Sequence, residues 1–185
     1  MQMAARQSGY FTAGQALEAG YSYQAQKYHA DRGNWQRIDR GLYRLPDWPI
    51  GPHDDLVRWS LWSKGRAVVS HETALSAYEL GDVNPARVHL TVPPGFRGRV
   101  LGAELHKSEL PSGDVREREG YRITTPARSL LDVATGNLDQ DLLTGAIRDA
   151  LDRGLTTRSA LLRRTPEFGP NAALRIERAL QAIAA

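Results

Sequence analysis

The feature that most constrains the fold of this chain is the pattern of residues 12–45, which predicts two short helices in close succession and then a hairpin. Thr12 is suited to cap the first helix, and Gly20 to end it in the left-handed conformation that glycine adopts easily. Ser22 is suited to cap the second helix, which we expect to run to about residue 32 and to end at Gly33. Residues 35–38 and 42–45 then alternate apolar with polar side chains around a turn at 39–41, as the strands of a hairpin do. A helix-turn-helix followed by a β-wing is the arrangement of winged DNA-binding domains.

The second helix is expected to have the two faces that a DNA-reading helix needs. Ala25, Tyr28 and His29 are spaced i, i+3, i+4, which predicts that they pack on the first helix. The remaining positions between residues 22 and 30 carry no carboxylate, and the arginines of the predicted hairpin can follow the minor groove or the phosphate backbone. An ordinary helical hairpin with a solvated face is the alternative, and the basic wing favours DNA binding. We therefore predict DNA contacts from seven side chains: Ser22, Tyr23, Gln24, Gln26, Lys27, Arg37 and Arg40.

The excess positive charge of the chain is concentrated in this N-terminal segment. The formal net charge is +3, and residues 1–45 hold six Lys or Arg against three Asp or Glu. A small excess of positive charge on the predicted DNA-binding segment favours binding at specific sites over non-specific binding along nucleic acid. The chain has no cysteine, which excludes disulfides and cysteine-ligated metals. It also has no run of about 18 apolar residues and no apolar signal at its N-terminus, so we expect a cytoplasmic protein without membrane contact.

Proline and glycine mark a boundary after the winged segment. Residues 46–52 hold three prolines and a glycine, which neither helix nor sheet accommodates. We therefore predict two domains, a winged helix-turn-helix DNA-binding domain over 1–48 and a C-terminal α+β domain over 53–185. Residues 1–8 leave room for only about two helical turns before the winged segment. The first domain is thus expected to need support from the rest of the chain or from a second copy, as in a homodimer on DNA.

The predicted second domain mixes helices and strands and ends in helices. Helices are expected over 54–63 and 71–80, with a brief apolar run at 67–69 between them. The later elements are strands over 87–92, 100–106 and 115–123, followed by helices that begin at Thr125-Pro126 and over 139–153, 156–164 and 171–184. The predicted fold class is therefore α+β: an N-terminal winged helix-turn-helix followed by a mixed α/β domain ending in helices.

Several segments occur in a recognisable order. They are GYFT at 9–12, AGQALEAGYS at 13–22, GNWQRIDRGLYRLP at 33–46, SHETALSAYELGDV at 70–83, RVHLTVPPGF at 87–96 and ITTPARSLLDVA at 123–134. In this order they resemble the AbiEi family, the antitoxin and transcriptional repressor component of type IV toxin–antitoxin systems. The resemblance covers about residues 9–135, and the Ser-His-Glu helix start together with the Thr-Pro-x-Arg helix start is its most specific part.

The resemblance implies a bipartite, non-enzymatic protein. Its winged helix would bind inverted repeats of double-stranded operator DNA in its own promoter, through the seven residues named above. Its C-terminal domain would provide antitoxicity against a nucleotidyltransferase-like toxin encoded by the partner gene. Two copies with recognition helices in the major groove would place half-sites about ten base pairs apart. The main rival is a protein-interaction module that neutralises the toxin without specific DNA binding.

No pattern in the second domain predicts catalysis, a cofactor or a metal site. His71-Glu72 begins like a zinc-protease helix, but Leu75 occupies the place of the second ligand, so Glu72 is interpreted as a carboxylate suited to a first helical turn. Glu104 and Lys107 are three residues apart and face opposite sides of a strand, which disfavours a nuclease site. Such a nuclease would use Glu104, Asp114 and Glu117. The five histidines show no ligand spacing: His29, His53, His71, His89 and His106.

Charged side chains of the last third have structural interpretations as well as functional ones. Arg128 and Asp132 are spaced i, i+4 and are expected to pair on one helix. Seven arginines stand on the last helices, against six acids from Asp139 onward: Arg148, Arg153, Arg158, Arg163, Arg164, Arg175 and Arg178. They could contact flanking phosphates, dock an acidic partner or form a solvated mixed face, and these three uses remain open.

Overall fold

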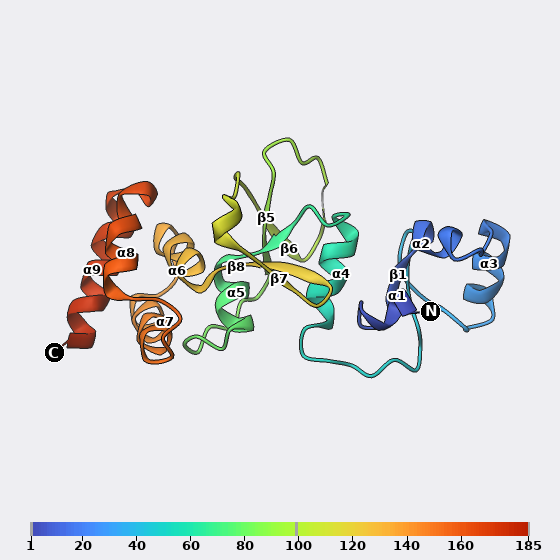
Figure 1. Cartoon of the computed structure of the whole chain (residues 1–185), viewed down its shortest axis with the longest axis horizontal. Coiled ribbons are helices and arrows are strands. Elements are labelled where there is room, and N and C mark those ends of the chain that lie inside the picture. The colour runs from blue at the N-terminus through green and yellow to red at the C-terminus, as the bar shows by residue number, and fades with distance from the viewer. Residues whose placement is uncertain (1, 99, 185) are drawn as a thin grey trace. The chain divides into compact units, whose positions relative to one another are not determined.

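The computed structural model of the chain describes residues 2–98 and 100–184 (Figure 1). The chain divides into two compact units, one of Met1–Ala67 with Glu117–Arg122 and the other of Val68–Arg116 with Ile123–Ala185. Helices are mixed with two β-sheets, and the C-terminal part is helical, which confirms the predicted α+β class and its helical end.

The first unit contains a small antiparallel sheet, two short helices in succession and a further helix. Its elements are α1 (Gln2–Ala5), β1 (Tyr10–Thr12), α2 (Ala13–Glu18), α3 (Tyr23–Asp31), β2 (Gln36–Asp39), β3 (Leu42–Arg44) and α4 (Asp54–Trp62). The strand order is β1-β3-β2, so the β2–β3 hairpin receives β1 on its far side. The predicted helices and hairpin are confirmed. The sequence does not predict β1, because three residues are too few to display an alternating pattern.

The second unit is built on a five-stranded mixed sheet. Its first elements are β4 (Val68–Val69), α5 (His71–Ala77), β5 (Val88–Val92), β6 (Ala103–Lys107), the 3-10 turn η1 (Ser112–Asp114), β7 (Val115–Arg118) and β8 (Tyr121–Thr124). The strand order is β6-β5-β4-β8-β7, with β5 parallel to β6 and antiparallel to β4. The prediction of one strand over 115–123 is wrong. Gly120, at φ +83°, lies in a turn that splits the segment into β7 and β8.

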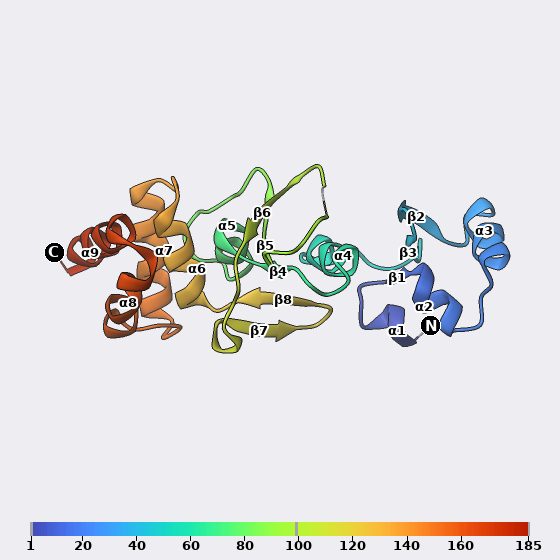
Figure 2. The ribbon, with the colours of Figure 1, turned by 90° about the horizontal axis from the view of Figure 1, so that it is seen from above.

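The chain ends in a group of packed helices. They are α6 (Pro126–Thr135), α7 (Gln140–Asp152), α8 (Arg158–Arg164), the 3-10 turn η2 (Thr165–Phe168) and α9 (Pro170–Ala184), in agreement with the predicted helices. Figure 2 shows α6, α7 and α9 side by side. Their facing side chains are fully buried, and they include Leu130, Leu143, Ile147 and Ile176. Burial of this apolar face is what stabilises helices that would be marginal in isolation.

A chain of buried ion pairs stabilises the start of α6. Arg128 Nε donates to Asp132 Oδ1 at 2.8 Å, which confirms the predicted i, i+4 pair. Arg128 also binds Asp114 at 3.1 Å, and Arg164 binds the same carboxylate at 2.6 Å. Burial raises the pKa of Asp132 to about 6, although Arg128 opposes the shift. Its Oδ2 finds no hydrogen-bond partner within the described part of the chain, so that oxygen is where a proton would bind.

Within residues 2–98 and 100–184, no helix combines the length and the apolar character that crossing a membrane requires.

Candidate nucleic-acid interface

Side-chain caps fix the turn between α2 and α3. Thr12 Oγ1 accepts the backbone N–H of Gln15 at 3.2 Å, and Gln15 Oε1 accepts the N–H of Thr12 at 2.9 Å, a reciprocal capping box. Gly20 follows α2 at φ +91°, a conformation that glycine adopts without steric cost. Ser22 Oγ then accepts the N–H of Ala25 at 3.2 Å and caps α3. The predicted caps Thr12 and Ser22 and the predicted helix end at Gly20 are confirmed.

Gln26 connects α3 to α2 from the inside. Its side chain is 1% exposed, and Nε2 donates to the backbone oxygens of Ala13 at 3.1 Å and Tyr21 at 3.0 Å. The prediction that Gln26 faces outward toward DNA is therefore wrong. Polarity alone suggested an outward position, but an amide can be buried when its donors are satisfied by backbone carbonyls. Gln26 is a packing residue and leaves the set of candidate DNA contacts.

An aromatic cluster fills the interior beside α3. Trp35 is 4% exposed and contacts Phe11 edge-on at 4.8 Å between ring centroids. His29 stacks on Trp35, also at 4.8 Å, and Tyr21 contacts the same ring at 5.1 Å. Tyr28 was expected to pack inward with His29 but is 55% exposed, since the other rings already occupy this interior. The cluster gives α3 a rigid support.

The outward face of α3 carries four of the predicted contact residues. Tyr23 is 69% exposed, and Ser22, Gln24 and Lys27 are exposed as well. Lys27 Nζ pairs with Asp31 at 2.6 Å, but both side chains are largely solvated. An exposed pair of this kind contributes little free energy, so the ammonium can exchange Asp31 for a phosphate. Tyr28 adds an exposed aromatic ring to the same helix.

The two arginines of the hairpin occupy different places in it. Arg37 lies in β2 opposite Tyr43, whereas Arg40 lies in the turn, beside Gly41 at φ +70°. Asp39 Oδ1 accepts the backbone N–H of Arg40 at 2.6 Å and fixes that turn, where the register of β2 shifts. Both arginine side chains are exposed. The hairpin therefore presents two solvated guanidinium groups, of which only Arg40 stands at the tip.

A buried ion pair anchors β3 to the start of α4. Arg44 Nη2 donates to Asp54 Oδ2 at 2.7 Å, and the two side chains are only 9% and 11% exposed. Arg44 Nη2 also donates to the backbone oxygen of Pro49 at 3.2 Å, and its guanidinium lies 5.2 Å from the ring of Tyr10. The end of β3 is thus held by residues that follow it in the chain.

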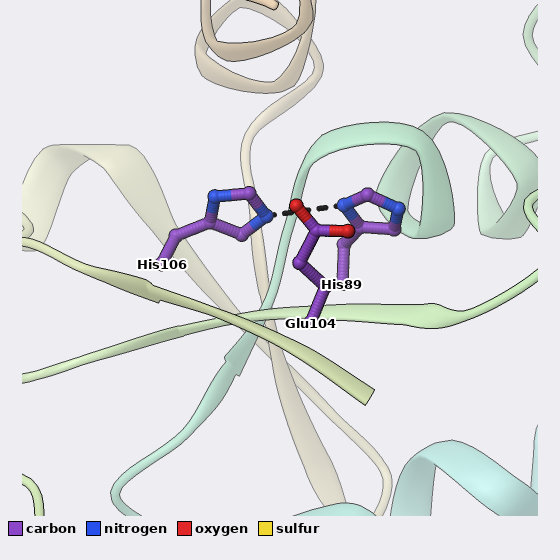
Figure 3. Close-up of side chains that lie close together, drawn as sticks. All are labelled: His89, Glu104 and His106. Carbon is purple, nitrogen blue, oxygen red and sulfur yellow. Dashed lines mark hydrogen bonds between the residues drawn. The ribbon is translucent and has the colours of Figure 1, made fainter. Parts of the chain in front are cut away.

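A cluster of histidines and acids forms in the second unit, which the sequence does not predict. Parallel pairing sets His89 opposite Glu104 and Thr91 opposite His106, so the three ionisable side chains share one face of β5 and β6. His89 Nδ1 lies 3.1 Å from His106 Nε2, and Glu104 stands beside this contact (Figure 3). The signal that could have found them is the alternation of Glu104 and His106 on one strand. What could not be foreseen is the register with β5.

The helix α5 adds two further members to this cluster. Glu72 Oε2 lies 2.6 Å from His89 Nε2, and the hydrogen bond lowers the pKa of Glu72. Glu72 lies in the first turn of α5, as interpreted from the sequence, and it also holds His89. The ring of His71 stacks on His106 at 3.5 Å, and burial with the neighbouring imidazoles lowers the pKa of His71 to about 3. Ser70 precedes α5 without a side-chain cap, and its Oγ lies 2.9 Å from His71 Nδ1.

Comparison with known proteins bears first on the N-terminal segment. Residues 1–46 match the family model described as transcriptional regulator, AbiEi antitoxin. This segment is similar to the AbiEi antitoxin regulators, and over these residues the resemblance inferred from the sequence is confirmed. No curated protein matches the chain.

Comparison with solved structures bears on the fold of the whole chain. The crystal structure of the RV2827C protein from Mycobacterium tuberculosis superposes with a TM-score of 0.64 at 15% sequence identity, over 99% of this chain and 78% of that one. At this identity the likeness shows the fold alone. It extends beyond residues 1–46, through nearly the entire chain.

The arginines in the last helices are less available than their number suggests. Of the seven, three donate to backbone oxygens and a fourth binds the Asp114 carboxylate: Arg153, Arg158, Arg175 and Arg164. Five of the seven are exposed: Arg148, Arg153, Arg158, Arg163 and Arg178. Two of these five, Arg153 and Arg158, are the ones that donate to backbone oxygens. Structural use of four arginines weakens the case for a basic surface on these helices.

The acids considered for a nuclease do not form a site either. Asp114 is 5% exposed, and both of its oxygens are bound by Arg164, with Arg128 on one of them. A carboxylate held in this way is not free to bind a metal or accept a proton. Glu104 belongs to the histidine cluster instead, so the trio of Glu104, Asp114 and Glu117 does not act together.

Proposed function

We propose that this chain is a DNA-binding transcriptional regulator and antitoxin, and that residues 1–48 act as a winged helix-turn-helix. The observation that carries the proposal is the outward face of α3, which has no carboxylate before Asp31, in a segment that matches the AbiEi antitoxin regulators. Helix α3 would read the major groove, and the β2–β3 hairpin would follow the backbone. Operator contacts would come from Ser22, Tyr23, Gln24, Lys27, Arg37 and Arg40.

The geometry assigns different roles to these residues. Gln24 and Tyr23 lie in the first turn of α3, the end of a recognition helix that contacts base edges, and they would contribute sequence preference. Lys27, Arg37 and Arg40 carry solvated charges that would neutralise phosphates. Symmetric operators are bound by symmetric dimers, so we expect two copies across an inverted repeat, with half-sites about ten base pairs apart.

The test is fluorescence anisotropy of the whole chain on its own upstream DNA and on a scrambled duplex, at one near-physiological salt concentration. We expect a preference of about a thousandfold or more for the upstream DNA. Lys27→Glu and Arg37→Glu should each weaken operator binding at least tenfold and make it less dependent on salt. Arg116→Glu introduces the same charge change at an exposed position of β7 and serves as the control. Equal, weak and salt-sensitive binding to both duplexes would refute specific recognition.

A second candidate function is supported by the exposed rings of Tyr23 and Tyr28 on α3. Exposed aromatic side chains favour protein contacts, so α3 could dock a protein, such as a nucleotidyltransferase-like toxin, without reading DNA. Toxin neutralisation in cells separates the two functions. If α3 reads DNA, Lys27→Glu abolishes repression and leaves neutralisation intact. If α3 docks the toxin, Tyr23→Ala and Tyr28→Ala abolish neutralisation and leave operator binding intact.

A further inference from the structure

The histidine and glutamate cluster on β5 and β6 has the donor set of a metal site. His89, Glu104 and His106 each offer one ligand atom, and these three atoms lie within 4.8 Å of one another (Figure 3). Two nitrogens bound to one tetrahedral Zn²⁺ at 2.0–2.1 Å are about 3.3 Å apart. The observed separation of 3.1 Å between His89 Nδ1 and His106 Nε2 is within a few tenths of an ångström of that value. The two imidazole nitrogens thus already stand at ligand spacing, and the Glu104 carboxylate stands close enough to complete the set.

Glu72 orients one of these rings as a metal site requires. Its carboxylate lies 2.6 Å from His89 Nε2, so Nε2 carries the proton and donates it, and the lone pair of the neutral ring is on Nδ1. Nδ1 is the atom that faces His106 and Glu104. A carboxylate on the far nitrogen of a ligating histidine is the usual support of protein metal sites, because it fixes both tautomer and ring orientation.

Other residues around the cluster restrict the His106 ring and leave room for a further ligand. His71 stacks on His106 at 3.5 Å with an interplanar angle of 14°, which restricts rotation of the His106 ring. Glu72, His89 and Glu104 also line a cavity of about 310 Å³, together with Asn84 and Arg87 among others. Three protein ligands beside an open cavity leave a fourth position to water or a small ligand.

We propose that His89, His106 and Glu104 bind a divalent transition-metal ion, for which Zn²⁺ is the best match to the imidazole and carboxylate donors, with Glu72 as a positioning residue. Without metal, His106 Nε2–H donates to His89 Nδ1. When the ion binds, it takes the place of that proton, which moves to Nδ1 of His106. This site goes beyond the proposed DNA-binding function and does not depend on it.

The test uses the untagged whole chain with Co²⁺ and Zn²⁺ alone. Co²⁺ gives visible absorption bands whose intensity reports tetrahedral ligation, and Zn²⁺ should displace it with one ion per chain. Glu104→Gln changes an exposed side chain and is expected to leave the fold intact while weakening binding more than about tenfold. Glu109→Gln makes the same change at another exposed position outside the cluster and should bind the metal normally.

Two further variants separate ligation from packing. His106→Ala should abolish the Co²⁺ bands, and its secondary structure is checked by circular dichroism. Glu72→Gln keeps a hydrogen-bonding group beside His89 but removes the charge, and should weaken Zn²⁺ binding about 10- to 100-fold without altering stoichiometry. The proposal is overturned if the unchanged protein shows no Co²⁺ bands, or if Glu104→Gln binds Co²⁺ as tightly as Glu109→Gln does.

Discussion

Gln26 offers a sharp test of the N-terminal architecture, because its polar side chain is buried where a recognition helix would be expected to expose it. Gln26→Ala removes two hydrogen bonds, to Ala13 at 3.1 Å and to Tyr21 at 3.0 Å, each contributing about 1 kcal/mol. It also leaves a cavity that costs about another 1 to 2 kcal/mol. The substitution also removes Oε1, which has no partner among the described residues, and this stabilises the fold by about 1 kcal/mol. The net loss in the free energy of unfolding is about 2 to 3 kcal/mol.

Tryptophan fluorescence measures this loss in the relevant part of the molecule. All four tryptophans belong to the first unit: Trp35, Trp48, Trp59 and Trp62. Urea unfolding followed by their emission therefore reports this unit, and with an m-value of about 1–3 kcal/mol/M the midpoint should fall by about 0.7 to 3 M. Gln26→Leu keeps most of the volume and removes the unpartnered oxygen, so it should lose about half as much.

Gln24→Ala is the matched control, because Gln24 lies two residues before Gln26 and is exposed on the same helix. It should change the free energy of unfolding by less than about 0.5 kcal/mol but weaken operator binding. Gln26→Leu should show the opposite behaviour, with a lower midpoint and unchanged operator affinity once folded. If Gln26→Leu were as stable as the unchanged protein and failed to bind operator, Gln26 would be a DNA contact and the packing of α3 described above would be wrong.

Three other perturbations have defined outcomes. Asp54→Ala leaves Arg44 buried without its carboxylate and should cost about 3 kcal/mol in the same fluorescence assay. Gly9→Ala places a Cβ 2.5 Å from atoms of Trp48, at a backbone φ of +79°, and should lower the urea midpoint of the first unit well below that of the unchanged protein. Asp132 has a pKa raised to about 6 by burial, so its charge destabilises the fold above that pH, and the penalty fades as pH falls through 6 toward 4. Urea unfolding followed by circular dichroism should therefore show about 1 kcal/mol of stabilisation between pH 7 and 5, which is absent in Asp132→Asn.

Local signals in the sequence were sufficient for most of the elements. Capping residues such as Thr12 and Ser22 act within their own helix, so their chemistry is visible without any tertiary information, and the helices they start were predicted correctly. The same holds for the pair Arg128–Asp132, which requires only helical spacing. The strand β1 was missed because its three residues are too few to display an alternating pattern, and only its pairing with β3 reveals it. The turn at Gly120 was missed although it is local, between the neighbouring strands β7 and β8.

The two errors that matter for function have one physical origin. Polarity predicts exposure on average, but a polar side chain whose donors are satisfied internally can be buried, as Gln26 is. The histidine cluster on β5 and β6 was also missed, because it too depends on tertiary contacts. No spacing along the chain relates His89 to His106, because the register of β5 on β6 brings them together. A contact set by spacing within one helix, such as Arg128–Asp132, could therefore be predicted from sequence, whereas burial against a second helix and contacts across strands could not.

The two functional proposals can be tested separately, because the tryptophans and the proposed metal ligands lie in different units. The tryptophans all belong to the first unit, whereas the proposed metal ligands belong to the second. Tryptophan emission and operator anisotropy thus follow the winged segment, and Co²⁺ absorption follows the histidine cluster. If Glu104→Gln loses the Co²⁺ bands and still binds operator, the metal site acts apart from DNA recognition. If it loses both, the ion is thermodynamically linked to DNA binding, and Zn²⁺ must then shift operator affinity by the same factor by which operator DNA shifts Zn²⁺ affinity.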